Sequence, residues 1–198
     1  MRHSLYQGDC IEFLTRTNNH FRCCFADIPD NIGLKYAGVS DKREDSDYYA
    51  FIGLFISYAL NRSDVLWLSF NARHLLEVAH RVRDDDVFVK PCVQTFTFGQ
   101  HRQTDLGNNH RPLWRITKDP NLEVYPDAVR VPSWRQLNGD PRADDRGKVP
   151  GDVFDFPRVT GNSKQRRRWH PTPLHEDLVE RCLRLVCRPG DWVLDPFA

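Results

Sequence analysis

Apolar and polar positions along the chain divide it into segments typical of buried strands and segments typical of amphipathic helices. Residues 21–26 are apolar or cysteine apart from Arg22, which predicts a strand buried on both faces of a parallel sheet. Residues 64–70 are also strand-like. Apolar residues recur at helical spacing in four segments, namely 10–16, 48–60, 72–82 and 177–187. Strands that alternate with helices predict an α/β fold with a mostly parallel sheet and helices on both faces.

The rest of the chain carries weaker signals. Short strands are expected at 4–7, 87–98 and 192–194, and residues 41–47 are expected to form a loop. From 101 to 155, Pro, Gly, Asn, Asp and Arg dominate and tryptophans are isolated, which predicts a loop-rich insertion. We therefore expect a first core part at 1–100, the insertion at 101–155, and a second core part at 156–198.

Composition narrows the class of protein. The 198 residues carry a net charge of +1, so a surface for nucleic acid has to be local. No apolar run reaches membrane-spanning length, and the N-terminus does not have the pattern of a signal peptide. The six cysteines form no CxxC pair, which predicts reduced thiols in a cytoplasmic protein and no metal site.

Three short segments stand where an α/β fold places ligands, at strand ends and helix starts. The first is Asp27-Ile28-Pro29-Asp30, followed by residues 31–36; the second is His170-Pro171-Thr172, and the third is Asp195-Pro196-Phe197. Together with Asp9-Cys10 near the start, this set resembles the permuted, β-type DNA amino-methyltransferases, which use S-adenosylmethionine to methylate adenine N6 or cytosine N4. In that family the target-base motif comes first and the cofactor motif last. The resemblance spans nearly the whole chain and implies a Rossmann-like methyltransferase fold.

The resemblance assigns catalysis to the first segment. An exocyclic amine is a poor nucleophile because its lone pair is delocalised into the ring; the Asp27 carboxylate and the Ile28 carbonyl would accept its hydrogens. Pro29 would stiffen the loop. The family tetrapeptide is Asp-Pro-Pro-Tyr or a near variant, and its aromatic residue stacks on the flipped base. Asp30 cannot stack, so Tyr36 or another aromatic supplies that face, or catalysis is impaired. From the residues alone, Asp27 fits a helix N-cap equally well.

The other segments are assigned to the cofactor by the same resemblance. Asp195 would lie beside the methionine part of S-adenosylmethionine, with Pro196 and Phe197 close by. Asp9 and Cys10 would lie at the adenine or ribose end. His170, Pro171 and Thr172 would line the pocket at a helix start. Taken singly, Asp195-Pro196 is better explained as a turn and His170-Pro171-Thr172 as a helix cap. Taken jointly, their order along the chain favours the cofactor.

The family motif continues beyond Asp-Pro-Phe through a glycine-rich turn, whereas this sequence ends at Ala198. We therefore expect an enzyme that is incomplete at its C-terminus. It is either a truncated product or half of a split protein whose cofactor site a second chain or dimer partner completes.

Basic residues suggest a surface for double-stranded DNA. Phosphate contacts are expected from a basic run near the second segment, which contains Lys164, Arg166, Arg167 and Arg168. The insertion at 101–155 is a candidate target-recognition segment, in which Arg111 and Arg135 are expected to contact DNA. A solvated charged loop explains the run almost as well. The sequence and the family resemblance together predict a site-specific DNA methyltransferase with no membrane partner. Its rivals are an inactive DNA-binding remnant and a methyltransferase acting on another planar amine, in RNA or protein.

Overall fold

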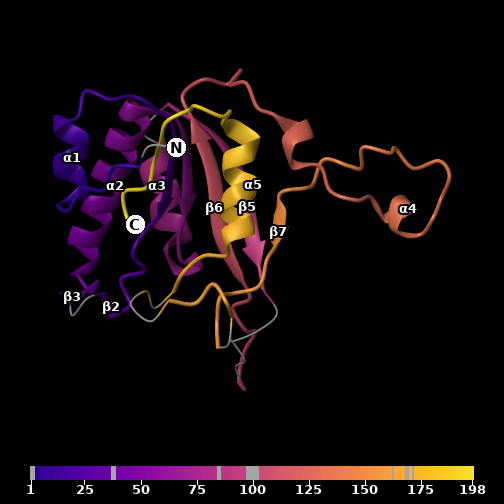
Figure 1. The fold of residues 1–198 in the computed structure, drawn as a ribbon. Helices are drawn as coiled ribbons and strands as arrows, with labels where there is room; N and C mark the ends of the chain where they lie inside the picture. The colour runs from indigo at the N-terminus through magenta and orange to yellow at the C-terminus, as the bar shows by residue number, and fades with distance from the viewer. Residues whose placement is uncertain are drawn as a thin grey trace.

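The computed structural model describes residues 3–36, 39–83, 86–96, 103–161, 163–167, 170 and 172–198. Its centre is a six-stranded sheet in the order β7-β5-β6-β4-β1-β8 (Figure 1). The strands are β1 (Phe21–Asp27), β4 (Ser63–Ser69), β5 (Phe88–Thr95), β6 (His110–Thr117), β7 (Val153–Asp155) and β8 (Val193–Leu194). A separate two-stranded sheet pairs β2 (Lys35–Tyr36) with β3 (Val39–Ser40).

The sheet is mostly parallel, as expected from the alternation of strands and helices. β1 runs parallel to both β4 and β8, and β5 runs parallel to β7. Among the described strands of this sheet, β6 alone runs against the others, between β4 and β5. The first residues of β6 therefore lie at the same edge as the last residues of β1 and β4.

Helices cover both faces of the sheet (Figure 1). One face packs on α1 (Cys10–Arg16), α2 (Asp45–Arg62) and α3 (Leu75–Arg83), and the other face packs on α5 (Glu176–Val186). Successive β1 side chains alternate between the two cores: Cys24 and Ala26 face the first, and Cys23 and Phe25 face the second. All four are buried, which confirms the predicted doubly covered strand.

The remaining elements are short. A 3₁₀ turn, η1 (Ala72–His74), precedes α3, and another, η2 (Pro126–Val129), follows β6. Helix α4 (Trp134–Leu137) sits in an arm that extends away from the sheet (Figure 1). A capping box between Ser133 and Gln136 starts α4, and a bridge between Val131 and Lys148 closes the arm at its base. None of the helices in the described ranges is both long and apolar enough to cross a bilayer.

Three sequence expectations differ from the structure. Residues 4–7 form no strand. The expected loop at 41–47 is shorter, because α2 begins at Asp45, where acidic residues in the first turn favour a helix N-terminus. Within the loop-rich region 101–155, residues 110–117 form the core strand β6. Pro112 and two arginines break the alternation that would have revealed this strand. The role of 101–155 in target recognition remains a prediction.

Candidate active site

The ends of three strands bring Asp27, in the first predicted motif, close to Arg111, which the sequence analysis assigned to DNA contacts. The register of β1 and β4 places Asp27 beside Ser69, and the register of β4 and β6 places Ser69 beside Leu113. Arg111, two residues before Leu113 on the antiparallel strand, reaches back to the same edge. In this α/β sheet the edge is the one formed by the carboxyl ends of β1 and β4, where ligands bind.

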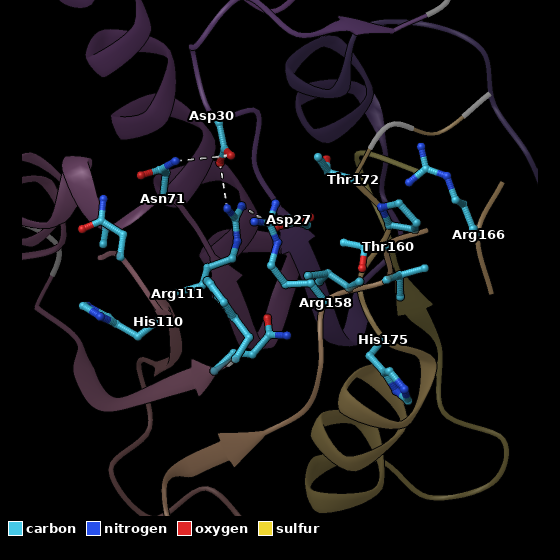
Figure 2. A pocket seen from close by; sticks show the side chains of 17 residues that line it. Asp27, Asp30, Asn71, His110, Arg111, Arg158, Thr160, Arg166, Thr172 and His175 are labelled. Atoms are coloured by element: carbon cyan, nitrogen blue, oxygen red, sulfur yellow. Dashed lines mark hydrogen bonds and ion pairs between the residues drawn. The ribbon is translucent and has the colours of Figure 1, made fainter. Parts of the chain in front are cut away.

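Arg111 joins these strand ends through all three nitrogens of its guanidinium group. Figure 2 shows its contacts with the two carboxylates. Nη2 donates to Asp27 Oδ1 at 2.7 Å, Nη1 to Asp30 Oδ1 at 2.9 Å, and Nε to Ser69 Oγ at 2.8 Å. Its side chain is only 17% exposed. Burial opposes the charged form, but the two carboxylates prevail and raise the pKa of Arg111 above its usual value.

This geometry corrects the sequence assignment of Arg111 to DNA contacts. Its guanidinium is largely buried and donates hydrogen bonds to three side chains of the protein, so it does not lie on the surface where a DNA phosphate would bind. The N-cap alternative for Asp27 is also wrong, because Asp27 ends β1 and its Oδ1 accepts from Arg111. Within the described residues, Asp27 Oδ2 has no hydrogen-bond partner.

The loop after β1 is held from the helix layer. Tyr48 donates its hydroxyl hydrogen to the Pro29 carbonyl at 2.6 Å. His74 Nε2 lies 2.9 Å from the Asp30 carbonyl, and its Nδ1 lies 2.9 Å from the Tyr49 hydroxyl. Because a carbonyl only accepts, His74 carries its hydrogen on Nε2 and accepts from Tyr49 at Nδ1.

Asn31 completes the loop in a left-handed conformation. Its φ is +56°, a region that asparagine tolerates better than most residues. Its side chain is fully buried, donates to Asp45 Oδ1 at 3.1 Å and accepts from the Arg43 amide at 2.7 Å. The loop that carries Asp27 and Asp30 is therefore fixed at its end. Neither Asn31 nor His74 was singled out from the sequence.

Two cavities meet at the paired carboxylates. The smaller, of about 170 Å³, is polar and is lined in part by Asn71, Gln94, Phe96, His110 and Arg158 (Figure 2). The larger, of about 570 Å³, has more apolar lining, including Phe25, Ile28, Tyr36 and Phe197. The residues that border both are Asp27, Asp30, Arg111, Thr172, Pro173 and Leu174. Asp27 therefore stands between a polar compartment and a largely apolar one.

Most of the residues predicted for the cofactor line the larger cavity or its neighbour. His170, Thr172, Asp195 and Phe197 line the cavity that contains Asp27. A third cavity of about 640 Å³ is lined by Asp9, Cys10 and Pro196, and Asp195 also borders it. Pro171 lies outside the described residues. Burial raises the pKa of Asp195 above its usual value.

Local contacts orient several of these side chains. The Tyr36 and Thr172 hydroxyls are 3.2 Å apart, and the His170 ring meets the Tyr36 ring edge-on at 5.9 Å. The Phe197 ring packs on Phe55 with centroids 5.0 Å apart. Asp9 Oδ1 caps α1 by accepting from the amides of residues 11 and 12. The helix-cap alternative for 170–172 is wrong, because α5 begins at Glu176 and its N-cap is His175.

Comparison with known proteins shows which family the chain belongs to. The sequence model of the DNA methylase family, whose members modify adenine N6 or cytosine N4, matches residues 21–198. The chain belongs to this family. Among its relatives, the type II methyltransferase M.ScaI of Streptomyces caespitosus is 26% identical over 211 residues, covering 98% of this chain and 69% of that protein.

Solved methylases share the fold. The PvuII cytosine-N4-specific DNA methyltransferase aligns with a TM-score of 0.70 at 14% identity, covering 96% of this chain and 72% of that one. M1.HpyAVI in its complex with SAM aligns with a TM-score of 0.58 at 14% identity, covering 97% of this chain and 80% of that one. At these identities the likeness shows the fold alone. It confirms the predicted Rossmann-like methyltransferase architecture.

The basic residues predicted to contact DNA lie in different parts of the structure. Arg166 lines the polar cavity, and Lys164 and Arg167 are exposed in the same loop. Arg167 donates to the carbonyls of residues 164 and 166, which shapes the loop. Arg135 lies on α4 in the extended arm, 3.9 Å from Asp140. Arg168 lies outside the described residues.

Arg158 was not predicted for the site, yet it points into the polar cavity toward Asp27 (Figure 2). Its guanidinium carbon lies 5.3 Å from the centroid of the Phe96 ring. The sequence carried one usable signal for it, namely its place in the Phe-Pro-Arg-Val run at 156–159.

His74 should make the stability of this methylase depend on pH. Burial lowers its pKa, so below the ordinary pKa of about 6.5 the unfolded chain binds a proton that the folded chain resists. The stabilising contribution is therefore complete above about pH 6.5 and is lost as the pH falls toward the folded-state value. In urea unfolding at several pH values, His74→Gln should flatten this slope, whereas a matched change of the exposed His80 should not. An equal slope in both variants contradicts the assignment.

Proposed function

We propose that this chain transfers a methyl group from S-adenosylmethionine to the exocyclic amine of adenine or cytosine in double-stranded DNA, at a specific sequence. The observation that carries the proposal is the position of Asp27 between two cavities, with no hydrogen bond to Oδ2 among the described residues. A flipped base in the polar cavity and a cofactor in the larger cavity would both reach this oxygen. Membership of the DNA methylase family supports the reaction class.

The residues of the larger cavities fit S-adenosylmethionine. The molecule combines a planar adenine ring with a positive sulfonium and amino group, and these cavities combine aromatic side chains with the carboxylates of Asp27, Asp195 and Asp9. Asp195 borders both, which suits a contact to the methionine part. Asp9 and Cys10 are then left for the adenosine end.

The polar cavity fits the target base. When bound, the cofactor supplies an electrophilic methyl group. Asp27 Oδ2 accepts a hydrogen bond from the amine, which draws the nitrogen lone pair out of the ring, and the carboxylate takes up the proton that the methylated nitrogen loses. Ile28 is buried beneath the site, and its carbonyl is proposed as the second acceptor. Pro29 and Asp30 keep the loop in place through the hydrogen bonds from the helix layer.

The DNA backbone is assigned to the basic loop next to the polar cavity. Arg166 lines that cavity, and Lys164 and Arg167 are exposed beside it, so phosphates flanking a flipped base would meet these cations. Arg168 in the same loop is proposed for the same role. Arg135, on the extended arm, would contact DNA farther from the target base.

The substrate class is tested with a labelled methyl group offered to three acceptors. Duplex DNA of mixed sequence, duplex RNA and a mixture of folded proteins are each incubated with the chain and labelled cofactor. We expect incorporation into DNA alone. Incorporation into RNA or protein in preference to DNA contradicts the proposal and favours a methyltransferase of another planar amine.

Phe96 is proposed as the aromatic face that the tetrapeptide lacks. Tyr36 lines the larger cavity with its hydroxyl engaged by Thr172, whereas Phe96 lines the polar cavity. Because stacking of a base on an aromatic side chain contributes ~1–3 kcal/mol, Phe96→Ala should lower kcat/KM for DNA by roughly 5- to 100-fold. The matched control is Phe88→Ala, at the opposite, exposed end of β5. Loss of kcat/KM in Tyr36→Ala but not in Phe96→Ala contradicts the assignment.

A further inference from the structure

The tetrapeptide of this chain has a carboxylate where its family has an aromatic ring, and the structure gives that carboxylate a partner. Asp30 Oδ1 accepts from Arg111 Nη1, while Asp27 Oδ1 accepts from Nη2 of the same guanidinium. Ser69 Oγ accepts from Nε. We call Asp27, Asp30, Arg111 and Ser69 the carboxylate clamp, of which Figure 2 shows the first three.

The clamp is held from several directions. Asp27 ends β1, Ser69 ends β4 and Arg111 is the second residue of β6, so the sheet fixes three of the four members. Asp30 is fixed independently: its carbonyl accepts from His74, and its Oδ2 accepts from Asn71 Nδ2 at 3.4 Å. A guanidinium tied to Asp27 alone would be free to turn about that contact. Asp30 and Ser69 supply the further points that fix its plane.

Charge gives the clamp a second property. One cation is shared by two carboxylates, which would repel each other without it. Among the described residues, Asp195 and Tyr36 also interact electrostatically with Asp27, and Arg158 points toward it. Asp195 and Asp30 are acidic like Asp27, whereas Arg111 places the opposite charge 2.7 Å from it.

We propose that Arg111 is a positioning residue that keeps Asp27 ionised with Oδ2 turned to the amine, and that Asp30 is the matched anchor of Arg111. The proposal rests on the proposed role of Asp27 as the carboxylate that accepts from the base. It explains how the chain accommodates a carboxylate in place of an aromatic ring: the position serves to fix the neighbouring acceptor instead of stacking on the base.

If Arg111 and Asp30 act as a pair on Asp27, the single and double variants should differ in the pH at which Asp27 is protonated. An arginine with only a structural role would not give this difference. In Arg111→Gln, two carboxylates face each other without a cation, so protonation of Asp27 should move to higher pH. In the double variant Arg111→Gln with Asp30→Asn, the repelling charge is also gone, so protonation should move back toward the value of the unchanged chain. A second substitution would then restore a property that the first one removed.

The experiment follows the carbon-13 carboxyl resonance of Asp27 through a pH titration of the full chain, without cofactor or DNA. We expect the midpoint to rise by about 1–3 pH units in Arg111→Gln and at least half of that rise to be reversed in the double variant. The matched control is Arg142→Gln, which removes an exposed arginine paired with Asp140 in the arm. An unchanged midpoint in Arg111→Gln, or a rise that Asp30→Asn does not reverse, overturns the proposal.

A second variant covers the case in which Arg111→Gln does not fold. Arg111→Lys keeps the charge but cannot donate to Asp27, Asp30 and Ser69 from one plane. The midpoint should then stay near that of the unchanged chain, while kcat for methyl transfer falls by about 10-fold or more because Oδ2 is no longer aimed. Full kcat in Arg111→Lys overturns the positioning role.

Failure of this proposal and failure of the proposed function are distinguishable. The titration reads the clamp directly, whether or not the chain transfers methyl groups. If Asp27→Ala keeps full activity, the proposed function of Asp27 fails, whereas the titration still decides whether Arg111 and Asp30 act as a pair. If Asp27→Ala is inactive and the double variant restores nothing, the clamp alone fails.

Discussion

Asp27→Ala is expected to lower kcat for methyl transfer to duplex DNA by roughly 100- to 10,000-fold, the range that a positioned proton acceptor contributes. The variant removes a carboxylate that lines both cavities and whose Oδ2 accepts no hydrogen bond among the described residues. Without it, the amine lone pair stays delocalised into the ring and the departing proton has no acceptor. The measurement is single-turnover transfer at saturating cofactor and DNA.

Two variants make this result specific. Asp27→Asn keeps an oxygen that accepts a hydrogen bond but removes the charge, so its rate should lie between those of Asp27→Ala and the unchanged chain. Asp152→Ala removes an exposed carboxylate paired with Lys90 on the far part of the sheet and should leave the rate unchanged. Full activity of Asp27→Ala would show that another group accepts the proton.

Asp195→Ala should weaken binding of S-adenosylmethionine by roughly 10- to 100-fold, as expected when a charged hydrogen-bonding group of about 1.5–3 kcal/mol is lost. Asp195 borders both large cavities, and burial raises its pKa, so a positively charged ligand would gain by pairing with it. Its Oδ1 accepts from the Phe197 amide at 3.0 Å, which leaves Oδ2 for the ligand. Titration calorimetry with cofactor alone measures the effect.

The same variant separates binding from chemistry. At saturating cofactor, Asp195→Ala should recover most of its rate, because the residue binds the cofactor and does not accept the proton. The matched control is Asp191→Ala, four residues earlier, where the exposed side chain accepts from the Arg188 amide. An unchanged Kd in Asp195→Ala would remove this carboxylate from the cofactor site.

The sequence was informative where one signal decided the local structure. The apolar run before Asp27 predicted a doubly buried strand, and its position placed the first motif at a strand end. The helical spacing of 177–187 likewise predicted α5 to within a residue. The motifs around Asp195 and His170 were joined to Asp27 through the family resemblance, and the structure brings described members of all three segments around one cavity.

Long-range pairing was beyond the sequence. Arg111 looked like a surface cation of a loop-rich region because Pro112 and Arg115 hide the alternation of β6. Only the antiparallel register of β6 brings Arg111 to Asp27 and Asp30, which precede it by 84 and 81 residues. The role of Asp30 was hidden for the same reason. In the sequence it only departs from the family motif, whereas in the structure it binds the distant Arg111.

The most direct test of the account is transfer of a labelled methyl group from S-adenosylmethionine to duplex DNA of mixed sequence, followed by digestion to nucleosides. The account predicts label in N6-methyladenine or N4-methylcytosine with the unchanged chain, and its loss with Asp27→Ala. Label in C5-methylcytosine, or no label from a folded chain that binds both the cofactor and DNA, would contradict it.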